Sequence, residues 1–123
     1  MKKARLKELS IEQLIEMTRT ASAERWRTIN AGKSKDGNRM FDLLVAIRRE
    51  LRARGLDAQR QLLGLIDDPE PGTRCWAAVS VLEFAPGEGE RVLAELAKLP
   101  DSLVGFSAEM TLEQWKAGTF KPL

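Results

Sequence analysis

Two stretches of equal length decide the fold: LLGLIDDPEPGTRCWAAVSVL at residues 62–82 and VLAELAKLPDSLVGFSAEMTL at residues 92–112. An offset of 30 residues aligns them without a gap, and each has the pattern of a helix, a short turn and a second helix. The aligned core positions are Leu62 with Val92, Leu63 with Leu93, Ile66 with Leu96, Trp76 with Phe106, Ala78 with Ala108, and Leu82 with Leu112. Helix pairs that bury their apolar faces only by stacking are typical of an α-solenoid.

The turn inside the first stretch carries a recognisable pattern. Asp67-Asp68-Pro69-Glu70-Pro71 is followed by Arg74 early in the second helix and by the paired alanines Ala77 and Ala78. This order resembles the HEAT repeat, in which an arginine braces the acids of the turn, although Thr73 stands where valine is usual. The resemblance implies that Arg74 pairs with Asp67 or Asp68 and has a structural role.

A narrower resemblance covers the chain from Asn38 to the end. It rests on the order Asn38-Arg39, Glu50-Leu51-Arg52-Ala53-Arg54-Gly55, the acidic-proline turn, and then Trp115, Gly118 and Phe120-Lys121-Pro122. This order is similar to a family of small bacterial HEAT-like proteins with no assigned function. The resemblance implies a helical superhelix and offers no active site to carry over.

The N-terminal part also has helical periodicity, but in a different register. Ser10 and Gln13 have the spacing of a capping box, and the helix that they begin either continues or breaks near Ser22 on its way to Ile29. Residues 30–37 are polar and contain glycine, which predicts a surface loop. A strong apolar stripe then predicts a helix that ends at Gly55; its residues are Met40, Leu43, Leu44, Ile47 and Leu51.

We therefore predict one all-α domain over residues 1–123, an α-α superhelix of about three HEAT- or armadillo-like antiparallel helix pairs without a sheet. Its predicted parts are N-terminal capping helices at 1–31, a long helix at 36–55, and repeats at 57–85 and 88–118. Small residues at Ala78 and Ala108 should let neighbouring helices approach closely.

Composition narrows the class of protein. The 123 residues are 43% hydrophobic and 31% charged with a formal net charge of +2, which is typical of a globular domain and too balanced to indicate a dedicated nucleic-acid binder. The single cysteine, Cys75, excludes an intramolecular disulfide and is expected to be a buried, inert thiol. The basic start, Met1 to Lys7, leads into no apolar signal segment, and no membrane-spanning stretch follows. We expect a cytoplasmic protein.

The absence of histidine removes the commonest catalytic and metal-binding arrangements. Asp67 and Asp68 are better explained by the turn than by acid–base catalysis. Gly32-Lys33-Ser34 imitates the end of a phosphate-binding loop, but Arg27 stands where that motif needs its first glycine. We predict no enzyme, no cofactor and no metal site.

The arginines Arg48, Arg49, Arg52 and Arg54 are the main charge feature. Arg48, Arg49 and Arg52 are expected to lie away from the apolar stripe, so they either form a solvated helix face or contact phosphates or an acidic protein.

The leading hypothesis is a small non-enzymatic adaptor or regulator that holds a protein or peptide on a concave surface. Its candidate contact residues are Asn38, Asp42, Arg49, Arg52, Thr73, Ser80 and Phe84. The residues expected to be structural are Asp68, Arg74, Trp76, Ala78, Ala108 and Leu112.

Two alternatives remain open, namely weak electrostatic nucleic-acid binding through the Arg48–Arg54 helix and a small carboxylate-dependent enzyme. The oligomeric state is open as well. Whether Trp76 packs between repeats or anchors a partner is also open at this point, as is the exposure of Phe84.

Overall fold

The capping box begins the first long helix, as predicted. The computed structural model describes residues 3–121, and in it Ser10 Oγ accepts a hydrogen bond from the backbone N–H of Gln13 at 3.1 Å. The Gln13 side chain accepts the reciprocal bond from the Ser10 N–H at 2.8 Å. Helix α1 (Ile11–Asn30) then continues without the break considered near Ser22. The Ser22 hydroxyl is buried and donates a hydrogen bond to the Thr18 carbonyl at 2.7 Å, so this polar group is satisfied inside the continuous helix.

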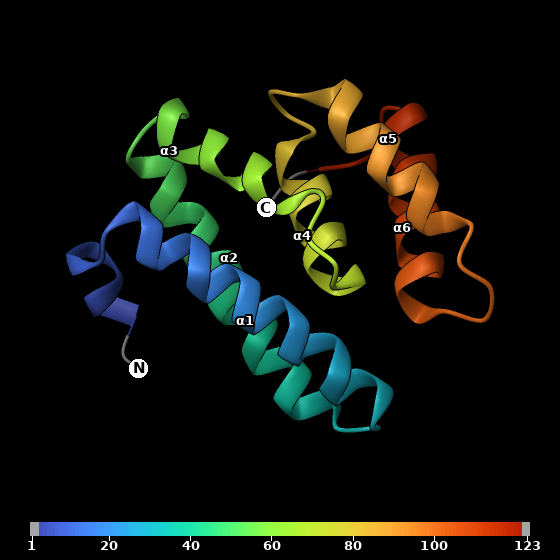
Figure 1. Cartoon of the computed structure of the whole chain (residues 1–123), viewed down its shortest axis with the longest axis horizontal. Coiled ribbons are helices and arrows are strands. Elements are labelled where there is room, and N and C mark those ends of the chain that lie inside the picture. Colours follow the sequence, from blue (N-terminus) through green and yellow to red (C-terminus); the bar gives the residue numbers. More distant parts are fainter. Residues whose placement is uncertain (1–2, 122–123) are drawn as a thin grey trace. The chain divides into compact units, whose positions relative to one another are not determined.

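Two compact units divide the chain, Met1–Leu62 and Leu63–Leu123. The first contains a short 3-10 helix, η1 (Lys3–Glu8), and the helices α1, α2 (Ser34–Ala53) and α3 (Leu56–Arg60). Figure 1 shows α1 and α2 as a hairpin, and α2 also contacts η1 and α3. Its core includes Leu14 of α1 with Leu44, Ile47 and Leu51 of α2, each at most 1% exposed.

The loop predicted at residues 30–37 is wrong in its second half, because α2 already begins at Ser34. Only residues 31–33 connect the two helices. Gly37 is buried where the hairpin closes, and a Cβ there would lie 2.9 Å from Ile29 Cγ1. The glycine that suggested a loop therefore serves close helix contact.

The first helix of the repeat predicted at 57–85 is also different from the expected one. It begins at Leu56 as α3, and from Gln61 to Leu65 it tightens into a second 3-10 helix, η2. Three residues per turn put Leu62 and Leu65 on one face of η2, and both are 1% exposed. In an α-helix the same two positions would lie about 60° apart around the axis.

The second unit contains α4 (Pro71–Val81), α5 (Pro86–Ala97) and α6 (Leu103–Lys116). Both α4 and α5 begin with proline in the first turn, where the missing N–H costs no hydrogen bond. Helix α5 packs against α4 and α6, and α4 also contacts α6 (Figure 1). Ala78 and Ala108 are both fully buried.

All regular structure in residues 3–121 is helical, with six α-helices and no strand. No helix in that range combines the length and the apolar composition needed to cross a bilayer. Met1, Lys2 and Pro122, which belong to the basic N-terminus and the C-terminal resemblance considered above, lie outside the described residues.

Candidate protein-binding groove

A groove of about 540 Å³ runs along the seam between α1 and α2. Its apolar lining consists of Leu9, Met17, Ala21, Met40 and Leu43. Ala21 is buried, whereas the other four are half-buried and keep part of their apolar surface accessible. The volume lies within the ordinary range of ligand pockets, about 300–1,000 Å³.

Polar side chains of α1 form the rest of the groove. Gln13, Glu16, Thr20 and Glu24 recur every three or four residues, so they follow one line along the helix. Glu16 lies 3.6 Å from Arg19, and Glu24 lies 2.7 Å from Arg27. Neither arginine lines the groove, and no lysine or arginine is among its lining residues.

A smaller hollow of about 190 Å³ shares Glu24 and Met40 with the groove. Thr28, Asp36 and Arg39 complete its lining. Arg39 donates to Asp36 at 2.8 Å, so the one cation here is already paired with an acid. The two hollows together follow the hairpin from Leu9 toward its closed end.

Both charged residues of the groove lining are carboxylates. Its two carboxylates, Glu16 and Glu24, are 64% and 40% exposed and each faces an arginine on its own helix. Within residues 3–121, no group of three or more His, Cys, Asp or Glu side chains is placed to hold a metal ion. The groove therefore offers an apolar floor with a hydrogen-bonding and acidic edge.

The contact residues predicted from sequence lie elsewhere. Asn38, Asp42, Arg49 and Arg52 are all exposed on α2, but none lines the groove. Their positions cluster on one face of α2, whereas Met40 and Leu43 belong to the apolar stripe on the opposite side of the helix. Periodicity placed Met40 and Leu43 in the apolar stripe of α2, but the spacing within one helix gives no signal that they stay half-buried and line a groove with Met17 and Ala21 of α1.

Thr73 and Ser80 were predicted as contact residues, but both are buried. They are 0% and 3% exposed, and Ser80 Oγ donates to the Trp76 carbonyl at 2.7 Å. The prediction assumed that α4 buries one face only, but its buried residues surround the helix. Phe84, after the end of α4, is half-buried.

The four arginines predicted as a group differ in how deeply they are buried. Arg48 is 4% exposed, contrary to expectation, because it follows Leu44 and precedes Leu51 at the i, i+4 and i+7 positions of the core stripe. Arg54 is half-buried, pairs with Glu50 at 2.9 Å and donates to the carbonyl of Leu6 at 2.9 Å. Only Arg49 and Arg52 of the four are exposed.

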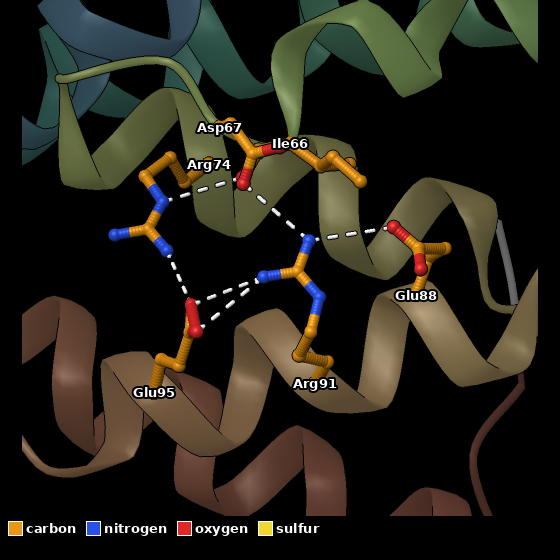
Figure 2. A network of polar contacts seen from close by, with 6 residues as sticks. All are labelled: Ile66, Asp67, Arg74, Glu88, Arg91 and Glu95. Atoms are coloured by element: carbon orange, nitrogen blue, oxygen red, sulfur yellow. Dashed lines mark hydrogen bonds and ion pairs between the residues drawn. The ribbon is translucent and has the colours of Figure 1, made fainter.

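The turn between η2 and α4 carries an ion-pair network (Figure 2). Arg74 Nε donates to the carbonyl of Ile66 at 3.3 Å, and its Nη2 lies 2.7 Å from Glu95. Asp67 pairs with Arg91 of α5 at 3.4 Å rather than with Arg74. Arg74 thus contacts the turn through the backbone carbonyl of Ile66 and also reaches a carboxylate of α5, Glu95.

Asp68 and Arg91 complete this region. Asp68 accepts a hydrogen bond from the Glu70 N–H at 3.0 Å, which is a turn contact. Arg91 also contacts Glu88 at 3.3 Å and Glu95 at 3.4 Å. The hydrogen bond to Glu88, followed by that to Asp67, raises the pKa of Arg91 above its ordinary value despite an opposing desolvation effect.

The aligned aromatic residues of the repeat have opposite surroundings. Trp76 is 7% exposed and packs in the interior, whereas Phe106 on α6 is 63% exposed. Phe106 lies in an accessible apolar row with Leu103 and Met110. Leu112 is half-buried. Phe106 therefore does not repeat the packing role that the alignment assigned to it.

The fold has a close structural relative. The crystal structure of the protein RPA1889 from Rhodopseudomonas palustris CGA009 matches this chain with a TM-score of 0.89 at 26% sequence identity, covering 96% of this chain and 98% of that chain. No curated protein matches the chain. The model of a domain of unknown function, DUF2019, matches residues 12–116. That range includes α1 from its second residue and all of α2 to α6, and the chain therefore belongs to the DUF2019 family.

Proposed function

We propose that this chain is a non-enzymatic protein-binding module, an adaptor or regulator whose partner inserts a segment into the groove between α1 and α2. The observation that carries the proposal is the apolar groove itself, about 540 Å³ in volume and lined by two methionines, Met17 and Met40. Methionine side chains adapt to differently shaped apolar partners, which makes them common at protein-binding surfaces.

The chain architecture supports this proposal. We infer that α4, α5 and α6 form a HEAT-like stack, because each packs against the next and residues 62–82 align with 92–112. Stacked helix pairs expose long side surfaces that commonly hold peptides. In this proposal the binding surface moves from the outward face of α2, predicted from sequence, to the seam of the α1–α2 hairpin.

The nucleic-acid alternative has less support from the side chains. Phosphate-dominated binding needs several accessible cations on one face. Arg48 is buried and Arg54 contacts Glu50 and Leu6, so Arg49 and Arg52 are the exposed members of the arginine group.

The test uses two variants that make the same chemical change at exposed positions. Thr20→Arg places a long side chain in the groove, whereas Asn38→Arg places it on the outward face of α2. Each variant and the parent are used to capture native partners from lysate at physiological salt, with and without nuclease, after circular dichroism has established that all three are folded.

The proposal expects the parent and Asn38→Arg to recover the same discrete protein and Thr20→Arg to lose it. Loss with Asn38→Arg and retention with Thr20→Arg would instead favour the outward face of α2. Recovery that disappears on nuclease treatment would overturn the protein-binding proposal in favour of nucleic acid.

A further inference from the structure

We propose that the occupant of the α1–α2 groove is a basic amphipathic helix. This inference rests on the proposed function and adds the chemical class of the partner. The edge of the groove carries two carboxylates, Glu16 and Glu24, and no lysine or arginine is among its lining residues. An occupant with cations beside its apolar row would therefore meet complementary charge, and one with carboxylates would meet like charge.

The lining favours a helix over an extended strand. Strand addition requires unpaired backbone N–H and C=O groups on the receiving protein. The groove is formed by the sides of two α-helices, whose backbone groups are bonded within each helix. An incoming helix satisfies its own backbone and needs only apolar contact, which Leu9, Met17 and Leu43 provide.

The dimensions set the spacing of the partner's residues. Gln13 and Glu24, which both lie on α1, are separated by about 16 Å at 1.5 Å per residue, which accommodates a partner helix of about three turns. Glu16 and Glu24 are about 12 Å apart along α1, and this matches two basic residues seven or eight positions apart on a helix lying along the seam. Apolar residues at i, i+4 and i+7 would face the groove floor.

The existing ion pairs leave these carboxylates available. Glu16–Arg19 and Glu24–Arg27 are surface pairs between residues three apart on one helix. Such pairs contribute little to stability, so a partner cation over a desolvated apolar floor can take the arginine's place.

A second copy of this chain is a poorer occupant. Its accessible apolar row on α6 contains Leu103, Phe106 and Met110. Glu109 and Glu113 lie three residues after Phe106 and Met110 and are exposed, so this row would bring carboxylates toward Glu16 and Glu24. Like charges at the edge disfavour that pairing.

The experiment compares two synthetic helical peptides that share one row of leucines and differ only in whether lysine or glutamate flanks it. Their affinities are measured at physiological salt for the parent chain, for Glu16→Lys/Glu24→Lys, and for the matched control Glu109→Lys/Glu113→Lys, which changes the net charge equally on α6. The lysine peptide should bind the parent and the control about tenfold more tightly than the glutamate peptide. In the Glu16→Lys/Glu24→Lys variant the preference should reverse.

Methyl-labelled methionine locates the bound peptide by NMR. Met17 and Met40 line the groove, and Met110 lies on α6, so the proposal expects the lysine peptide to shift the first two signals and leave Met110 unchanged.

Equal binding of both peptides at Met17 and Met40 would overturn the basic-helix inference and leave the groove proposal intact. Binding reported by Met110 alone, or an equal loss in the two double variants, would also overturn the inference. If neither peptide binds and Thr20→Arg still recovers the native partner, the proposed groove function fails as well.

Discussion

Replacing Gly89 by alanine tests how closely α4 and α5 approach. Gly89 is buried in the first turns of α5, and a Cβ built there lies 2.7 Å from the carbonyl oxygen of Ala78 and 2.7 Å from Leu82 Cδ2. The leucine side chain can rotate, but the carbonyl belongs to the backbone of α4. The added methyl group is therefore expected to push the two helices apart.

The magnitude follows from two opposing effects. Alanine in a helix gains about 1 kcal/mol over glycine, whereas overpacking a buried contact costs about 1–3 kcal/mol. Since the obstacle is backbone, we expect the larger cost, and Gly89→Ala should lower the free energy of unfolding by about 1–2 kcal/mol. Gly87→Ala is the matched control on the same helix, because a Cβ there meets nothing within 4 Å. It should be neutral or stabilise by up to about 1 kcal/mol.

The assay is urea unfolding followed by circular dichroism at the helical band, with thermal unfolding as a second measure. Gly89→Ala should move the midpoint down and Gly87→Ala should leave it unchanged or move it up. If both variants were equally stable, or if Gly89→Ala were the more stable, the close approach of α4 and α5 at this point would be refuted.

Three further predictions concern the core, a cap and the ion-pair network. Trp76→Ala should cost about 3–5 kcal/mol and Phe106→Ala less than about 1 kcal/mol in urea unfolding, because the first side chain is 7% and the second 63% exposed; equal costs would contradict this burial. Ser10→Ala should cost about 1 kcal/mol by the same measurement, because it removes the capping hydrogen bond at the start of α1, and no loss would mean that the cap is dispensable. Arg91 has a raised pKa, so its ion pairs contribute stability that is lost only as the pH rises through that strongly alkaline value. The difference in unfolding free energy between the parent and Arg91→Gln should therefore stay constant from neutral to mildly alkaline pH, and a decline over that range would contradict the assignment.

Local signals in the sequence predicted most helices and several of their ends. The Ser10–Gln13 box and Pro71 act within one turn, through backbone groups that any helix start leaves unpaired, so neighbouring residues suffice to predict them. Gly37 shows the limit of that reasoning. In sequence it indicates a loop, but in the hairpin it lies inside α2 against Ile29, a contact that only the packed pair of helices creates.

The predicted site residues were less successful for a related reason. Asn38 and Arg49 are exposed as their positions on α2 suggest, but Thr73 and Ser80 are buried because α4 is enclosed on more than one side. The groove could not be predicted from one helix at a time. Met17 of α1 and Met40 of α2 both line it, and whether side chains fill or leave open the seam between two helices depends on the distance and rotation of both.

The sequence by itself determined the all-helical class and the order of the main helices, because periodicity, caps and prolines act over a few residues. The tertiary structure alone decided which of two aligned aromatic residues is buried, which arginines are internal and where an apolar groove stays open. Those properties depend on which neighbouring helix covers each face, and the residue periodicity of a single helix does not specify its neighbours.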